Sequence, residues 1–226
     1  MRHLLLIASL LCCISWFSSC SDDDSHAPNW ELSFVDALTD HNGTVTHLRT
    51  DDGTVYAIDA PFAELPWPSA TRAKDDEANR LTPDSLYRCI CSYEKTGTAS
   101  LRISSISSIL TTKPAKKSNL GTDPINLQSV WWGSRYLNVY FTVMGIDGKH
   151  LFTFVEDSIT RQPSGINILH LTLRHTSQEA IEGYPRKLYI SCILEGYDTQ
   201  LKTGRDSIYF SVPQSATQLH TVKLEY

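Results

Sequence analysis

The stretch VWWGSRYLNVYFTVM, residues 130–144, decides the fold of this chain. Two tryptophans precede a Gly133-Ser134 turn, and a strand with strict period-2 alternation follows over residues 135–144. Successive side chains of a strand point to opposite faces, so this strand has two chemically different faces. One face carries the apolar residues Leu137, Val139, Phe141 and Val143, and the other carries Tyr136, Asn138, Tyr140, Thr142 and Met144.

The composition is that of a globular protein with an acidic balance. The chain has 226 residues, of which 41% are apolar and 20% charged, and its net charge is -5. This length suffices for one large domain or two small ones. Basic residues gather only as a short group, Lys113, Lys116 and Lys117, so we do not expect nucleic-acid binding.

The N-terminus reads as a lipoprotein leader. Arg2 and His3 precede an apolar run over residues 4–17, which is shorter than the roughly 20 residues that span a bilayer. Phe17-Ser18-Ser19-Cys20 resembles a lipobox, the site at which a signal peptidase cuts before a lipidated cysteine. We expect a signal peptide at 1–19, lipidation of Cys20 and a tether over 20–29. The alternative is an ordinary secretory leader that ends at about the same place.

An acidic run follows the cysteine. Ser21, Asp22, Asp23 and Asp24 resemble the tag that directs lipoproteins of Bacteroidota-type bacteria to the outer face of the outer membrane. The alternative is a solvated tether, which most charge runs are. We expect an outer-membrane protein that is lipid-anchored and exposed at the cell surface, with the periplasmic face as the alternative.

The first half of the mature chain predicts a small barrel. Strand patterns occur at 30–34, 44–50, 54–58, 86–94 and 99–110, with Asn42-Gly43 and Asp52-Gly53 as tight turns. Five short strands in so short a segment are typical of an OB-like barrel, which we place at 30–112. A long proline-rich loop over 60–84 interrupts them. A phase change near Ile106 predicts a bulge.

The second half predicts a β-sandwich. A polar segment with Pro114, Gly121 and Pro124 is expected to be the linker, at 113–124. Seven strand candidates separated by turn signals then favour an immunoglobulin-like β-sandwich at 125–226. The candidates are 125–132, 135–144, 149–156, 166–175, 187–195, 206–212 and 217–225.

The cysteines do not form a disulfide framework. Cys12 and Cys13 belong to the leader, and the remaining Cys89, Cys91 and Cys192 are odd in number. We expect small buried thiols at these positions.

The sequence contains none of the common catalytic signatures, such as a serine elbow, a zinc-binding helix or a phosphate-binding glycine loop. Asp51-Asp52-Gly53 is interpreted as a hairpin turn and not as a calcium loop. The histidines, among them His150, are interpreted as hydrogen-bonded strand residues. We therefore expect no enzymatic activity, no catalytic residue, no metal site and no cofactor.

Aromatic residues are the candidates for binding. Tyr136 and Tyr140 flank Asn138 on the second face of the central strand, and Trp67 lies in the proline-rich loop. Exposed aromatics of this kind anchor a protein partner or stack on a sugar. The alternatives are that the other domain or a loop covers the strand face and that Trp67 folds back on the barrel.

The motif Arg135-Tyr136-Leu137-Asn138, followed by His150-Leu151, resembles the NigD-like lipoproteins of Bacteroidota-type bacteria, a family named after a bacteriocin locus. The resemblance implies an OB-like N-terminal domain and a cell-surface lipoprotein. The expected function is a non-catalytic binding or assembly module, held at the membrane by Cys20. Its expected partner is a surface protein or a glycan, and the alternative function is a carbohydrate-binding or glycan-utilisation accessory.

Overall fold

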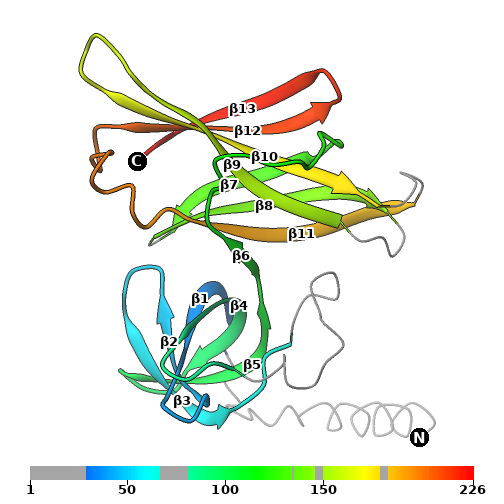
Figure 1. Ribbon diagram of the computed structural model, residues 1–226. Helices are drawn as coiled ribbons and strands as arrows, with labels where there is room; N and C mark the ends of the chain where they lie inside the picture. Colours follow the sequence, from blue (N-terminus) through cyan, green and yellow to red (C-terminus); the bar gives the residue numbers. More distant parts are fainter. Residues whose placement is uncertain (1–28, 67–80, 134, 146–149, 179–182) are drawn as a thin grey trace, which may run out of the picture.

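The computed structural model describes residues 29–66, 81–133, 135–145, 150–178 and 183–226. These residues form thirteen strands and no helix, so no described helix is available to cross a membrane. The strands make two bodies, a barrel and a sandwich, which lie one against the other (Figure 1). The predicted all-β architecture is therefore confirmed.

The N-terminal body is a closed five-stranded barrel in the order β1-β2-β3-β5-β4. All neighbouring pairs are antiparallel except β3 and β5, which pair in parallel at Ala57 and Ile58. The expected bulge lies in β5 at Ser104, which has no partner in β4. The strands are β1 (Glu31–Thr39), β2 (Val45–Thr50), β3 (Val55–Phe62), β4 (Leu86–Lys95) and β5 (Ser100–Ser108).

The barrel core is small and contains two of the free thiols. Val35, Leu48 and Leu101 are fully buried, and so are Cys89 and Cys91. Burial raises the pKa of Cys91 to about 12 and raises that of Cys89 further, so both remain protonated near neutral pH. A protonated buried thiol is inert, which confirms the interpretation of these cysteines as packing residues.

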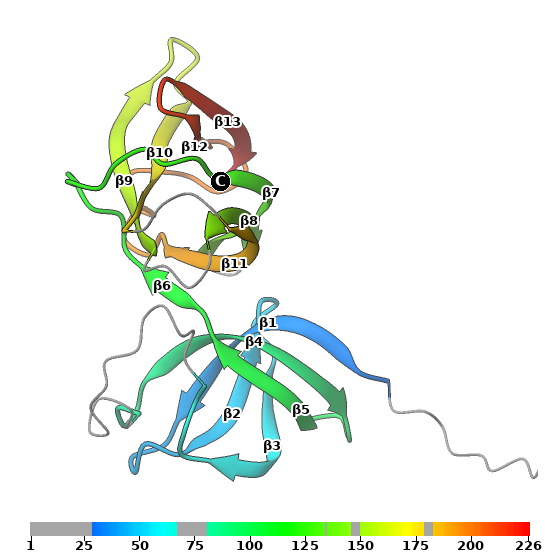
Figure 2. The ribbon, with the colours of Figure 1, turned by 90° about the vertical axis from the view of Figure 1, so that its right-hand side faces the viewer.

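The C-terminal body is a sandwich of two four-stranded sheets, β6-β11-β8-β7 and β13-β12-β10-β9 (Figures 1 and 2). Each expected strand is present, and β6 is an additional one that pairs in parallel with β11. The strands are β6 (Leu110–Thr112), β7 (Asn126–Gly133), β8 (Tyr136–Gly145), β9 (His150–Arg161), β10 (Asn167–Ser177), β11 (Tyr184–Ile193), β12 (Ser207–Ser215) and β13 (Gln218–Glu225).

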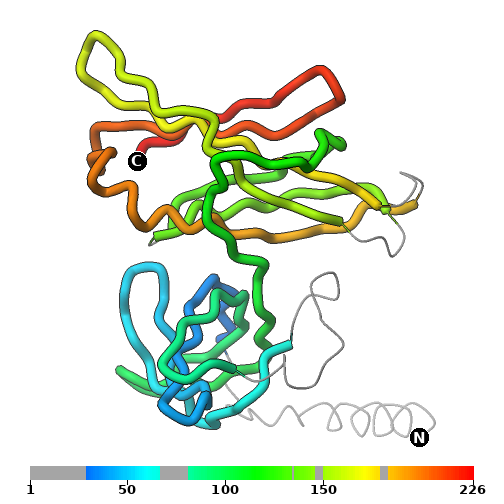
Figure 3. Tube along the Cα trace, viewed as in Figure 1, coloured from blue at the N-terminus to red at the C-terminus, as the bar shows by residue number. Residues whose placement is uncertain are grey.

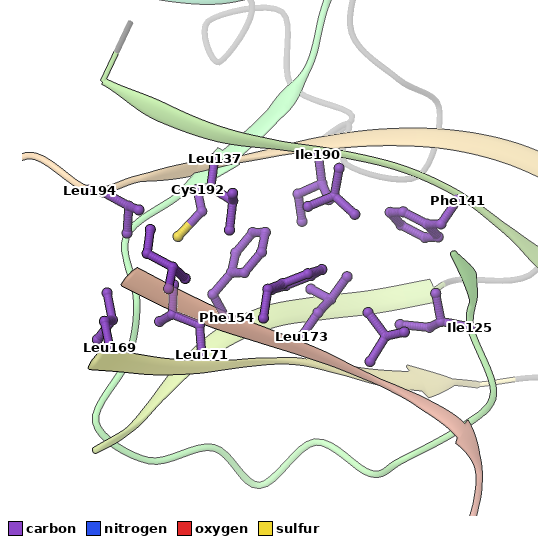
Figure 4. Close-up of a cluster of buried hydrophobic side chains, with 14 of the residues drawn as sticks. Ile125, Leu137, Phe141, Phe154, Leu169, Leu171, Leu173, Ile190, Cys192 and Leu194 are labelled. Atoms are coloured by element: carbon purple, nitrogen blue, oxygen red, sulfur yellow. The ribbon is translucent and has the colours of Figure 1, made fainter. Parts of the chain in front are cut away.

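The apolar face of β8 packs in the centre of the sandwich. Leu137 and Phe141 point toward Phe154 and Leu171 of the opposite sheet, as Figure 4 shows. Each of these four side chains is fully buried. The two faces predicted from the alternation of the sequence are therefore the two faces of the strand.

The segment that the sequence predicts as a linker lies on the sandwich. Residues 113–124 lie along the sandwich, where the Ala115 N–H donates to the Phe154 carbonyl (2.8 Å) and the Asp123 N–H donates to the His175 carbonyl (3.1 Å). The chain instead crosses between the two bodies from Ser108 to Leu110, where β5 leads into β6 (Figure 3). The polar composition of 113–124 therefore reflects an exposed strap and not a free connection.

The first prediction concerns this core. Replacing Phe141 by Ala should lower the free energy of unfolding by about 3–5 kcal/mol, because it empties a fully buried aromatic site. Urea denaturation of the mature protein measures this loss. The control is Leu219→Ala, which removes a side chain that is 50% exposed and should change the stability by less than about 0.5 kcal/mol. Equal losses in the two variants would contradict the assignment of the faces.

Candidate functional site at the interface between the domains

The second face of β8 lies against the barrel. Tyr136 is 3% exposed and Asn138 is fully buried. Burial then decreases along the strand, since Tyr140 is partly buried and Met144 is 42% exposed. The sequence left open whether this face is an exposed recognition surface or is covered. In the structure, the barrel domain covers its first part. Tyr136 and Asn138 are thus interface residues and do not form an exposed recognition surface.

Aromatic rings fill the contact on one side. The Phe34 ring of β1 meets Trp131 of β7 edge-on, with 5.1 Å between the centroids, and meets Tyr189 of β11 at 5.6 Å. Tyr140 stacks on Tyr189 at 4.8 Å. One barrel residue therefore packs against two rings of the sandwich, and Tyr140 stacks on one of them.

Four charged side chains of the barrel form a partly buried group, which we call the interdomain ion cluster: Asp36, Arg49, Asp51 and Arg88. Both Arg88 Nη atoms reach the Asp51 carboxylate, at 2.6 Å and 2.9 Å. Asp36 lies 3.5 Å from Arg88 and 2.7 Å from Arg49. The side chains of Arg88 and Asp36 are 1% and 2% exposed, whereas those of Arg49 and Asp51 are each 28% exposed. The two cations and two anions therefore balance in charge, and one pair of them is almost fully withdrawn from water.

Arg88 connects this cluster to the sandwich. Its Nη2 donates to Asn138 Oδ1 (3.3 Å), and Ser191 Oγ donates to the same oxygen (2.8 Å). The guanidinium also lies over the Tyr136 ring, 4.4 Å from the centroid, a geometry that is favourable for a cation and an aromatic face. The family motif residues Tyr136 and Asn138 thus receive a side chain from the other domain.

Gly133 makes room for this arrangement. A Cβ at that position would lie 2.1 Å from Asp51 Oδ2 and 2.7 Å from Asn138 Nδ2. The sequence indicated only a turn at Gly133, and only a hairpin turn at Asp51. The Asp51-Asp52-Gly53 turn is confirmed, with Gly53 at a φ of 87°. Asp52 accepts from the Thr54 N–H (2.9 Å) within the turn, which leaves Asp51 for the cluster.

A cleft of about 330 Å³ opens beside the cluster, between the two domains. Leu86 and Arg88 come from the barrel, Arg135 and Tyr136 come from the sandwich, and the crossing segment with Ile109 forms a wall. Arg135 donates from Nε to the Tyr136 hydroxyl (3.3 Å) and from Nη1 to Glu195 (3.4 Å). This cleft was not predicted, because its walls come from segments far apart in the sequence.

A second buried polar group lies at the other end of the sandwich. His150 Nδ1 and His175 Nε2 are 2.9 Å apart, and His175 Nδ1 lies 3.2 Å from the Asp123 carbonyl. A carbonyl only accepts, so His175 Nδ1 carries a proton and Nε2 accepts from His150. Burial, followed by the neighbouring His150, lowers the pKa of His175. His150 is therefore a hydrogen-bonded strand residue, as the sequence indicates.

The remaining sequence-predicted site residues lie outside the described residues: Cys20, Ser21, Asp22, Asp23, Asp24 and Trp67. Within the described part of the chain, no group of three or more His, Cys, Asp or Glu side chains is placed to hold a metal ion.

An OB-like barrel fixed to a β-sandwich through a partly buried ion cluster defines a two-domain, all-β class of protein. Residues 108–226, more than half of the chain, match the NigD-like C-terminal beta sandwich domain. The chain belongs to the NigD-like family. The match begins at residue 108, where the chain leaves the barrel.

Solved structures share the whole two-domain fold. A NigD-like immunity protein from Bacteroides caccae is 23% identical, with a TM-score of 0.61 over 88% of this chain and 93% of that one. A protein from Parabacteroides distasonis described as toxin-related is 18% identical, with a TM-score of 0.64 over the same shares. A Bacteroides fragilis protein described as a lipoprotein is 15% identical, with a TM-score of 0.52 over 87% and 98%. No curated protein matches the sequence.

The second prediction tests the interdomain ion cluster. Arg88→Gln should lower the free energy of unfolding by about 3–5 kcal/mol, because it removes the buried cation that Asp36 and Asp51 share and leaves the cluster with an excess negative charge. Restoring neutrality with Asp36→Asn in the same chain should recover part of the loss. Arg102→Gln is the matched control, since its side chain is 62% exposed and its ion pair with Asp59 spans 3.8 Å. If urea denaturation shows the same stability for Arg88→Gln and Arg102→Gln, the assignment of Arg88 to a stabilising interdomain cluster is wrong.

The third prediction concerns the histidine pair. The pKa of His175 is lowered in the folded state, so the unfolded chain takes up a proton first as the pH falls below about 6.5. Its contribution to stability is complete above that pH and declines below it, by at most about 1.4 kcal/mol per pH unit. Unfolding measured from pH 7.5 to 5 should therefore show a steeper loss for the wild type than for His175→Gln. The exposed His220→Gln serves as the control and should follow the wild type.

Proposed function

We propose that this protein is a non-catalytic cell-surface lipoprotein, a binding or assembly module held at the outer membrane by a lipid on Cys20. The observation that carries the proposal is the use of the buried ionisable groups. In the described residues, the interdomain ion cluster and the histidine pair join strands or domains to one another. Side chains committed in this way build a stable surface and leave few groups for acid–base chemistry.

Two further carboxylates support this reading. Asp206 is fully buried and accepts from the Asn167 N–H (3.0 Å) and the Lys202 N–H (2.8 Å), and its contact with Arg205 holds its pKa well below the usual range. Glu156 accepts from Lys116 of the 113–124 strap. Both carboxylates fasten loops onto the sandwich, and a strongly depressed pKa suits a permanent anion better than a general acid or base.

The anchor would hold the barrel near the membrane. Ten Cα–Cα steps connect Cys20 to Trp30, which starts the folded part. Fully extended, they reach about 35 Å. The lipoprotein description of the similar B. fragilis structure supports an anchor. The acidic run at 22–24 supports export to the outer face.

The partner in this proposal is another protein at the cell surface. The similar structures described as an immunity protein and as toxin-related support a role in binding a protein. An immunity-type role of this kind is part of the proposal. The glycan alternative rested on Trp67, Tyr136 and Tyr140. Tyr136 is buried in the interface and Trp67 lies outside the described residues, so no observed surface favours it.

The fourth prediction tests the anchor and the binding role together. Cys20→Ala should move the protein from the membrane to the soluble periplasmic fraction and abolish labelling with palmitate. Cross-linking of intact cells should give a discrete adduct with a second protein for the wild type and lose it for Cys20→Ala. Protease added to intact cells should degrade the wild type, because the proposal places the protein on the outer face of the outer membrane.

Three results would count against parts of this proposal. Retention of Cys20→Ala in the membrane contradicts the anchor. Wild-type cells without any adduct contradict the binding role. Resistance to added protease, followed by digestion after the outer membrane is opened, places the protein on the periplasmic face.

A further inference from the structure

The interdomain cleft carries features that a merely structural interface does not need. β5 pairs with β4 as far as Ser108 and Cys89, and the Ile109 N–H still donates to the Arg88 carbonyl (2.8 Å). The chain then leaves for the sandwich. The first residues of β4 therefore have no partner in β5, and the cleft opens where the two strands diverge. Its volume of about 330 Å³ is at the low end of the roughly 300–1,000 Å³ of ligand pockets.

The two ends of the cleft differ in chemistry. Leu86, Ile109 and Ile193 supply apolar surface, and Leu86 is 37% exposed. Both charged residues in the lining, Arg88 and Arg135, are arginines. Asp36 and Asp51, which neutralise Arg88, do not line it. A ligand that matches this lining has an apolar body and an anionic head.

In this proposal the donors for such a head come from Arg135 and from the Nε of Arg88. The Arg88 side chain is 1% exposed, yet its Nε has no hydrogen-bond partner among the described residues. A buried donor in that state destabilises the protein, and an acceptor from a ligand would relieve this cost. Arg135 lies over the same Tyr136 ring at 5.5 Å, and its pairing with the 60% exposed Glu195 is weak. Guanidinium groups are well suited to bind a carboxylate through two hydrogen bonds.

The two aliphatic hydroxyls in the lining favour a peptide over a simple fatty acid. Ser108 Oγ donates to the Pro66 carbonyl (2.9 Å), and Thr111 Oγ1 donates to the Ile109 carbonyl (2.9 Å). Each hydroxyl has then used its hydrogen, and its oxygen is left to accept. A fatty acid has no donor for these oxygens, whereas a peptide has the amide N–H of its last residue.

We infer that the interdomain cleft binds the free C-terminus of a polypeptide that ends in a large apolar residue. The terminal side chain lies among Leu86, Ile109 and Ile193, and the terminal carboxylate lies on Arg135 and Arg88. This inference rests on the proposed function, because it specifies what a protein partner presents. Capture of a terminal carboxylate is an established mode of peptide recognition.

The fifth prediction measures this binding directly. The probe is a dye-labelled hexapeptide ending in Phe with a free carboxylate, and the protein is the mature lipidated chain in lipid nanodiscs. Fluorescence anisotropy should show saturable binding. The same peptide with an amidated C-terminus, and one ending in Gly, should each bind at least about 10-fold more weakly, which corresponds to roughly 1.4 kcal/mol.

Variants of the protein provide the second arm. Arg135→Gln should weaken binding at least about 10-fold, a change that corresponds to roughly 1.4 kcal/mol. Leu86→Trp should weaken binding by filling the cleft from its partly exposed rim. Arg102→Gln, with its side chain 62% exposed on the barrel and outside the cleft lining, is the matched control and should bind as the wild type does.

Several results would overturn the inference. The inference is wrong if the free-acid peptide does not bind or if the amidated peptide binds equally well. It is also wrong if Arg135→Gln binds as tightly as the wild type, or if octanoate displaces the probe as effectively as unlabelled peptide does. Cross-linking in cells separates this failure from failure of the proposed function. A wild-type adduct without peptide binding removes only the cleft assignment, and the absence of both removes the binding role as well.

Discussion

The burial of Arg88 is the constraint on which the arrangement of the two domains depends. Its guanidinium is almost fully withdrawn from water, and a charge in that position must be paired and hydrogen-bonded. The barrel provides the pairing through Asp36 and Asp51, and the sandwich provides the Asn138 oxygen and the Tyr136 ring. Because these partners come from β1, the β2–β3 turn and β8, small rotations of one domain against the other would separate Arg88 from at least one of them.

Charges and rings have different roles in this contact. A buried ion pair repays its desolvation only with good geometry and often adds little net stability. The aromatic contact of Phe34 with Trp131 and Tyr189 removes apolar surface from water, which is the dominant favourable term in packing. We conclude that the rings stabilise the interface and that Arg88 fixes its register. Gly133 also helps to fix the register, since any larger residue would displace Asp51 or Asn138.

The sequence predicted the features that depend on neighbouring residues. Alternation in β8 identified both faces of that strand, because the period of a strand is a local property. The short strand β6 was missed, since its three residues pair in parallel with β11, about eighty positions further along the chain. The same reason explains the strap at 113–124, whose partners lie in β9 and β10. Asp51 and Asp52 are chemically alike, and only the folded barrel distinguishes the one that pairs with Arg88 from the one that closes the turn.

The position of the cleft links what it binds to how the domains are held. Arg88 belongs to the barrel and Arg135 to the sandwich, so a ligand that contacts both binds only the assembled arrangement. Such a ligand stabilises that arrangement by RT ln(1 + [L]/Kd), about 2.7 kcal/mol at a ligand concentration of 100 times Kd. The coupling is reciprocal, so a substitution that loosens the interdomain contact weakens binding without touching the ligand. Arg88 therefore belongs both to the cluster that fixes the interface and to the lining of the cleft that the interface creates.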